Sequence, residues 1–132
     1  MRFLIMLFAS LAMTVAAGTA SAADAKRGEK QFGRCKACHS TDAGKNKIGP
    51  SLHGVVGRKA GTAEKYKYSK SLAAAGAKGL VWTEENLMGY LENPTNFLKK
   101  YLETKSVSNK MKNNFKNKSL RENIIAYLKT VK

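Results

Sequence analysis

The pentapeptide Cys35-Lys-Ala-Cys-His39 constrains this chain more than any other feature. A C-x-x-C-H sequence is typical of covalent haem attachment, in which each thiol adds to one vinyl group and the histidine ligates the iron. The spacing is essential, because moving either cysteine by one residue would lose a vinyl group or the ligand. We therefore expect one covalent haem c, with Cys35 and Cys38 as thioether residues and His39 as an axial ligand.

Three other roles for the two cysteines have to be weighed. A thioredoxin-like redox pair requires a βαβ pattern around the motif, and none is visible. A zinc site would have four possible ligands: Cys35, Cys38, His39 and His53. However, His39 adjoins Cys38 and strains to share one tetrahedron with it, and no H-x3–5-H spacing appears. A structural disulfide in an exported protein is the third possibility.

Residues 1–22 have the pattern of a secretory signal peptide. Arg2 precedes an apolar run over residues 3–17, and small residues follow, ending with Ala20-Ser-Ala22. This order predicts cleavage after Ala22 and export to the periplasm, leaving a single domain over residues 23–132. Residues 3–23 carry no charge and could just span a bilayer, so an uncleaved membrane anchor is the alternative.

The charge of the chain limits its partners. Residues 1–22 contain a single charged residue, Arg2. The remaining 110 residues contain 23 Lys and Arg and nine Asp and Glu, which gives a net charge of +14. Nucleic acid is not expected, because the basic residues are overwhelmingly lysine and no nucleic-acid motif appears. Acidic docking patches on a membrane complex, or anionic lipid, fit such a charge better.

Helical patterns dominate the chain and no strand alternation is visible, so we expect an all-α domain. Asp24 is expected to cap a helix over residues 24–34, in which Gly28 allows close approach of another helix. Residues 40–68 are rich in glycine and lack periodicity, which predicts a long loop that binds something. Residues 103–118, rich in Lys, Asn and Ser, predict a second, exposed loop.

Capping residues predict where the other helices begin. The expected starts are Ser69, Thr83, Asn93 and Ser119. The helix after Ser69 is expected to end at Gly76. For the last helix, Ser119-x-x-Glu122 has the pattern of a capping box.

The second axial ligand has to be His53, Met88 or Met111 if His39 fills the first position. Met88 lies among leucines on a predicted helix, where a methionine is ordinarily core. Met111 is nearly alone as an apolar residue in a Lys/Asn-rich segment, which favours it as the ligand, with His53 or an open position as alternatives. A His/Met pair raises the reduction potential relative to two histidines, and filling both positions favours electron transfer over catalysis.

Further motifs follow the pentapeptide in a fixed order: Gly49-Pro-Ser-Leu-His-Gly54, Gly57-Arg-Lys-x-Gly61, Tyr66-x-Tyr-Ser69, Trp82-x-Glu-Glu-x-Leu-Met-x-Tyr-Leu-Glu-Asn-Pro94, Lys110-Met111 and Ile124-Ile-Ala-Tyr-Leu128. Together they resemble class I cytochrome c of the soluble mitochondrial and alphaproteobacterial type. The 16 residues between Pro94 and Met111 resemble its longer bacterial form. The resemblance implies a small all-α fold, with helices and loops wrapped around one covalently attached haem.

The resemblance also implies roles for particular residues. Met111 would be the second axial ligand, and the carbonyl of Pro50 would accept the ring N–H of His39. The residues that would hold the haem propionates are Arg58, Tyr68 and Trp82. Tyr90 would lie close to the Met111 sulfur, and His53 would be a loop residue. The crossing of the first and last helices would involve Gly28, Phe32, Tyr127 and Leu128.

The methionine loop departs from the family pattern. Met111 is followed by Lys-Asn-Asn-Phe rather than by a single residue before phenylalanine. Asn109 stands two residues before Met111, where the family has threonine, and Ser108 precedes it. The hydrogen bonding of this loop is therefore open at this point.

The function expected is that of a soluble, monomeric one-electron carrier of the periplasm, not an enzyme. A quinol–cytochrome c reductase would donate electrons, and a terminal oxidase or photosynthetic reaction centre would accept them. The basic residues expected near the exposed haem edge are Arg34, Lys36, Lys47, Lys99, Lys100, Lys105, Lys110 and Lys112. For any single one of them, a place on a solvated face is the more common role. A gas-binding haem protein, in which Met111 leaves the iron, is the main alternative, and a peroxidase is a weaker one.

Overall fold

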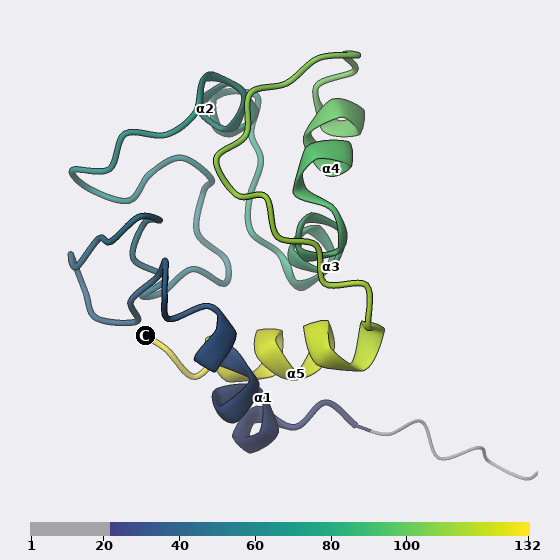
Figure 1. The fold of residues 1–132 in the computed structure, drawn as a ribbon. Helices are drawn as coiled ribbons and strands as arrows, with labels where there is room; N and C mark the ends of the chain where they lie inside the picture. Colours follow the sequence, from purple (N-terminus) through teal and green to yellow (C-terminus); the bar gives the residue numbers. More distant parts are fainter. Residues whose placement is uncertain (1–21) are drawn as a thin grey trace, which may run out of the picture.

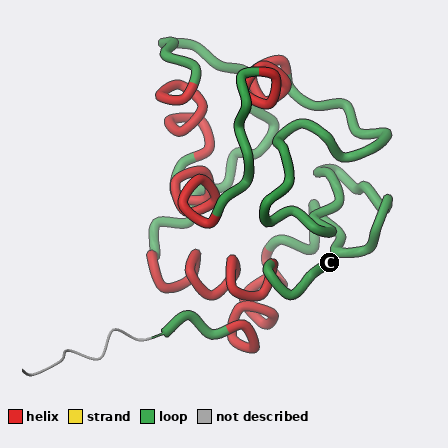
Figure 2. The backbone as a smooth tube through the Cα atoms, turned by 180° about the vertical axis from the view of Figure 1, so that it is seen from behind, coloured by secondary structure: helices red, strands yellow, loops and turns green. Residues whose placement is uncertain are grey.

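The computed structural model describes residues 22–132, and nearly all regular structure in this part is α-helical (Figure 1). The helices are α1 (Ala25–Gln31), the 3-10 turn η1 (Phe32–Arg34), α2 (Lys70–Ala77), α3 (Glu84–Glu92), α4 (Pro94–Tyr101) and α5 (Lys118–Leu128). No strand occurs between residues 22 and 132, where a single antiparallel bridge joins Lys59 and Val81 (Figure 2). The predicted all-α class is confirmed.

The predicted signal peptide, residues 1–22, lies outside the described residues except for Ala22. Over residues 22–132, every helix is too short or too polar to cross a membrane.

Helices α1 and α5, from the two ends of the domain, cross in direct contact (Figure 1). A Cβ atom at Gly28 would lie 1.9 Å from the backbone oxygen of Asn123, so only glycine permits this approach. Near the crossing, the Asp24 N–H donates to Asn123 Oδ1 at 2.8 Å, and the Phe32 and Tyr127 rings lie 5.3 Å apart. The role predicted for Gly28 is confirmed.

Four of the five predicted helix caps are confirmed. The side chains of Asp24, Ser69, Thr83 and Asn93 each accept a backbone N–H in the first turn of the following helix. These short polar side chains satisfy donors that have no partner within the helix.

The predicted start of the last helix was wrong. The cap is Asn117, whose side chain accepts the Leu120 N–H at 2.9 Å, and not Ser119. Both residue types cap helices well, so residue type alone does not decide between them. The earlier start places Arg121 in the first turns of α5, where its guanidinium donates to the carbonyls of Phe115 and Lys116 at 2.6 and 2.8 Å.

Helix α2 also ends later than predicted, at Ala77, and the residue with positive φ after it is Gly79, at 105°. Gly76 lies inside the helix instead. A Cβ there would approach the Ala60 carbonyl oxygen to 2.1 Å, so Gly76 is a packing residue between α2 and the long loop.

We expect Asn117→Ala to lower the free energy of unfolding by about 1 kcal/mol, because the Leu120 N–H loses its acceptor. Ser119→Ala is the matched control and should change it by less than about 0.5 kcal/mol, because Ser119 is exposed and does not cap. Urea unfolding of both variants measures the difference. A larger loss for Ser119→Ala would return the cap to that position.

Long loops complete the fold. Residues 40–68 lie on the opposite side of the molecule from α3 and α4, and residues 103–117 run past α3 toward the start of α5 (Figure 1). Phe32, Leu80, Leu98 and Ile124 are the large side chains at the centre of the core. Trp82, Tyr90, Phe97 and Tyr101 form an aromatic chain along α3 and α4, with successive centroids 4.8, 5.8 and 6.1 Å apart.

Candidate functional site

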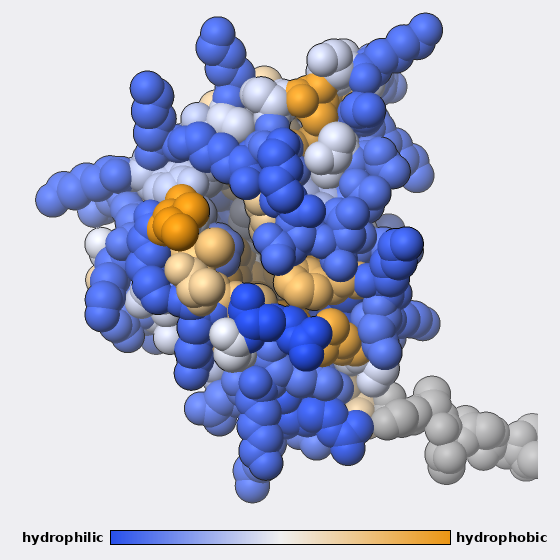
Figure 3. Space-filling view, viewed as in Figure 1, coloured by the Kyte–Doolittle hydropathy of each residue, from blue (hydrophilic) through white to orange (hydrophobic). Residues whose placement is uncertain are grey.

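A cavity opens between the two long loops and the helices, and its wall includes the pentapeptide, both loops and residues of α2, α3 and α5. The residues predicted for the site all line it: Cys35, Cys38, His39, Pro50, Arg58, Tyr68, Trp82, Tyr90 and Met111. His53, the alternative ligand, does not. Figure 3 shows a hollow on this face with apolar side chains at its mouth and long hydrophilic side chains around it. The structure thus brings together residues that lie up to 76 positions apart in the sequence.

His39 is held in one tautomer and one orientation. Its Nδ1–H donates to the Pro50 carbonyl at 2.8 Å, which leaves the Nε2 lone pair free to bind a metal. Burial lowers the pKa of His39, although the Pro50 hydrogen bond partly offsets this, so the ring favours the neutral form that ligates metals.

Gly49 is a site residue to which sequence reasoning gave no role. A Cβ at Gly49 would lie 2.4 Å from Cε1 and 2.7 Å from Nδ1 of His39, so any side chain here would displace the imidazole. The Gly49 N–H also donates to the Cys38 carbonyl at 2.7 Å, which joins the long loop to the pentapeptide. In the sequence, Gly49 was only one of the glycines that predicted the long loop over residues 40–68.

Cys35 and Cys38 are both free thiols in the structure. The pentapeptide forms a tight turn after η1, in which the N–H groups of Cys38 and His39 both donate to the Cys35 carbonyl, at 3.1 and 2.9 Å. In the chain without haem attached, burial raises the pKa of the Cys35 thiol to about 11.

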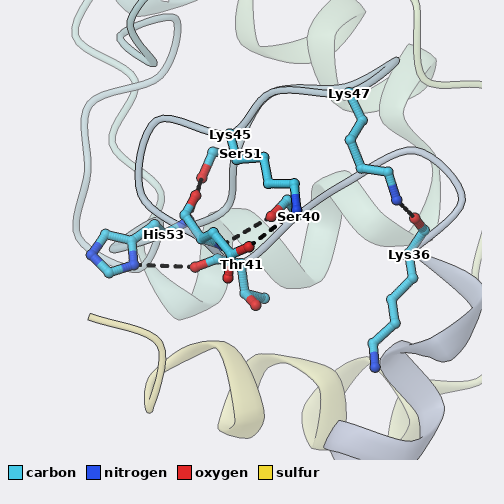
Figure 4. Close-up of polar contacts among 8 residues, drawn as sticks. Lys36, Ser40, Thr41, Lys45, Lys47, Ser51 and His53 are labelled. Atoms are coloured by element: carbon cyan, nitrogen blue, oxygen red, sulfur yellow. Dashed lines mark hydrogen bonds and ion pairs between the residues drawn. The ribbon is translucent and has the colours of Figure 1, made fainter.

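The structure does not assemble the alternative zinc site. The His53 ring is engaged elsewhere, with Nδ1 3.1 Å from the Thr41 carbonyl (Figure 4). Between residues 22 and 132, three or more His, Cys, Asp or Glu side chains nowhere gather in a group that could hold a metal ion.

Polar contacts hold the loop over residues 40–53 in place of regular structure (Figure 4). Ser51 Oγ donates to the Asp42 carbonyl at 2.6 Å, and the Lys47 ammonium donates to the Lys36 carbonyl. The Ser51 N–H donates to Asn46 Oδ1 at 2.9 Å. These contacts fix the backbone on both sides of Pro50, and therefore the acceptor that orients His39.

The methionine loop is anchored more firmly than its polar sequence suggests. At one end, the Ser108 N–H donates to Ser71 Oγ at 2.8 Å. At the other end, the Phe115 N–H donates to the Leu91 carbonyl at 2.9 Å. The loop was expected to be exposed throughout, yet Asn109 in it is buried.

The cytochrome c family model matches residues 25–132. The chain belongs to the cytochrome c family. Its relatives include cytochrome c2 of Rhodopseudomonas palustris, 45% identical over 97% of this chain and 95% of the relative. Cytochrome c2 of Rhodobacter capsulatus is 44% identical over 93% of each chain. The solved structure of ferricytochrome c2 from Rhodopseudomonas palustris has a TM-score of 0.77 at 45% identity and covers 83% of this chain and 99% of its own.

Membership in the cytochrome c family settles the cofactor and the class of activity. The protein carries a covalently bound haem c, and it is an electron carrier rather than an enzyme. The class I cytochrome c fold predicted from the sequence is confirmed by the same structural neighbours.

Arg58 provides a test of whether this cytochrome's cavity fits a haem. Its Nη1 and Nη2 donate to the carbonyls of His53 and Ser51 at 2.9 and 3.0 Å, but its buried Nε has no acceptor within the protein. Burial lowers the pKa of Arg58, so an anionic group beside it is favourable. A haem propionate would supply the missing acceptor and the opposite charge, so the residues present fit the group.

Two tyrosine hydroxyls, those of Tyr68 and Tyr90, also line the cavity and differ in their hydrogen bonds. The Tyr68 hydroxyl accepts the Ala63 N–H at 2.9 Å and keeps its own proton to donate. The Tyr90 hydroxyl donates to Asn109 Oδ1 at 3.4 Å, two residues before the predicted ligand. Burial raises the pKa of Tyr90, so its hydroxyl stays protonated at physiological pH.

Proposed function

We propose that this cytochrome c carries single electrons through the periplasm, with Cys35 and Cys38 as thioether residues and His39 and Met111 as axial ligands. The observation that carries the assignment is the cavity itself, whose wall combines Cys35 and Cys38 with the His39 imidazole and the Met111 thioether, 72 residues apart in the sequence. The bound haem supplies iron that exchanges one electron between its ferrous and ferric forms.

The chain's own residues would orient the group and limit rearrangement. Pro50 holds the His39 ring in one tautomer, and the unpaired Arg58 Nε could donate to a haem propionate. The anchors at Ser108 and Phe115 hold both ends of the Met111 segment. With His39 and Met111 both held by the fold, an electron would be exchanged with little rearrangement, and a gaseous ligand would have to displace Met111.

We further propose that residues 1–22 are a cleaved signal peptide and that residues 23–132 act as a periplasmic monomer. The donor would be a quinol–cytochrome c reductase, and the acceptor a terminal oxidase or a photosynthetic reaction centre. The net charge of +14 after cleavage supports partners with acidic docking patches, because long-range attraction speeds encounter and still permits fast release. Of the eight basic residues expected near the haem edge, Arg34 and Lys110 line the cavity.

We expect electron transfer from a purified quinol–cytochrome c reductase to slow steeply as ionic strength rises, because screening weakens the encounter. Arg34→Glu should lower the second-order rate constant at low salt by roughly fivefold or more, and the loss should shrink near 1 M salt. Arg27→Glu, on the exposed part of α1 and outside the cavity wall, changes the net charge equally and is the control. A rate independent of salt, or equal losses for both variants, would contradict docking at the cavity face.

A further inference from the structure

Asn109 is buried in a loop whose neighbours on both sides are exposed. Only 8% of its surface is accessible, whereas Ser108 and Lys110 lie open to solvent. A buried amide requires partners for its oxygen and its nitrogen, because an unpaired polar group inside a protein is costly. The partners of Asn109 therefore show why it is buried.

Two of these partners belong to the backbone of Met111. Asn109 Nδ2 donates to the Met111 carbonyl at 2.6 Å, and the Met111 N–H donates to Asn109 Oδ1 at 3.3 Å. The backbone hydrogen bonds of residues 22–132 include none from the Met111 N–H or to its carbonyl. One side chain thus holds both polar groups of this residue.

Two further contacts connect Asn109 to the helices behind the loop. The Tyr90 hydroxyl of α3 donates to Oδ1, and Nδ2 donates to Thr95 Oγ1 of α4, both at 3.4 Å. Asn109 therefore contacts α3 and α4 while it also holds the backbone of the loop that contains Met111. Because the single proton of Tyr90 is directed to the amide oxygen, it is not committed to the Met111 sulfur.

We infer that Asn109 is a positioning residue for the axial methionine, which holds the Met111 backbone and so sets how readily the thioether leaves the iron. The inference rests on the proposed assignment of Met111 as a ligand. It gives the asparagine a part in the redox function, since a firmly held thioether stabilises the ferrous state and keeps outside ligands away from the iron.

Competition with free imidazole for the ferric iron of the holoprotein tests this role. Asn109→Ala removes both contacts to Met111, and we expect the imidazole affinity to rise by about tenfold or more, equivalent to 1.4 kcal/mol. Asn109→Asp keeps the size and the acceptor for the Met111 N–H but loses the donor to its carbonyl, and should raise the affinity in the same direction. If the alanine variant fails to incorporate haem, the aspartate variant still answers the question.

Two controls separate positioning from general stability. Asn114→Ala changes an exposed asparagine of the same loop and should leave the imidazole affinity within twofold of the parent. Ser71→Ala removes the anchor at Ser108 but no contact to Met111, and should lower the urea midpoint more than it changes imidazole binding.

The possible outcomes are distinct. Imidazole affinities within twofold of the parent for both Asn109 variants would overturn the positioning role, even if their urea midpoints fell. A parent protein without a ferric methionine–iron charge-transfer band would instead refute the assignment of Met111, and with it the basis of the inference. We expect the Asn109 variants to bind imidazole more tightly and to show a weaker methionine–iron charge-transfer band. Asn114→Ala should show neither change.

Discussion

Met111→Ala is expected to abolish the methionine–iron charge-transfer band of the ferric protein and to lower the reduction potential by on the order of a few tenths of a volt. The reason is that a thioether favours ferrous iron, and axial ligands together span roughly 0.8 V of haem potentials. Absorption spectra in both redox states and a potentiometric titration measure the two effects.

Met88→Ala is the matched control. Met88 packs against the core from α3 and does not line the cavity, so its loss should lower stability while leaving the band and potential nearly unchanged. Carbon monoxide provides a second measurement: the reduced parent should bind it poorly at neutral pH, and Met111→Ala should bind it readily. Persistence of the band in Met111→Ala would transfer the axial role to another residue, and tight carbon monoxide binding by the parent would favour the gas-binding alternative.

Gly28→Ala is expected to have the largest effect on stability, with a loss of about 3 kcal/mol or more in the free energy of unfolding. The added Cβ would lie 1.9 Å from the Asn123 oxygen and 2.5 Å from its carbonyl carbon, and neither backbone atom can move without separating α1 from α5. For a domain of this size the loss corresponds to a fall of roughly 12 °C or more in Tm. Thermal unfolding of the holoprotein followed by circular dichroism measures it.

Gly33→Ala is the comparison, because a Cβ at Gly33 would meet no atom within 4 Å and the residue has no positive φ. It should change the free energy of unfolding by no more than about 0.5 kcal/mol. Similar losses in the two variants would mean that glycine's backbone freedom matters at both sites, and not the contact between the helices.

Helix starts could be predicted wherever the capping chemistry is local. Asp24, Ser69, Thr83 and Asn93 each cap through their own side chain, so a few adjacent residues hold the information. Asn117 and Ser119 are both adequate caps two residues apart, and the contacts of Arg121 with the Phe115 and Lys116 carbonyls accompany the earlier start. Capping preference by residue type does not distinguish the two positions.

In the candidate site, too, the residues that could be predicted are those whose signal is local in the sequence. Cys35 to His39 could be predicted because haem attachment fixes a short covalent spacing. Met111 emerged because a solitary methionine in a polar segment has no place in a core. Asn109 stood out only as a departure from the family pattern, since the role that we infer for it depends on Tyr90 and Thr95, which other helices bring to it.

The contact between α1 and α5 bears on when the pentapeptide becomes enclosed by the fold. Asp24 meets Asn123 across 99 positions, and the Gly54 N–H donates to the Val131 carbonyl, so both the helix crossing and the long loop depend on the final residues. Cys35 and Cys38 are synthesised well before α5. Because contacts of such long range form late in folding, the pentapeptide would stay accessible for haem attachment until α5 has been made.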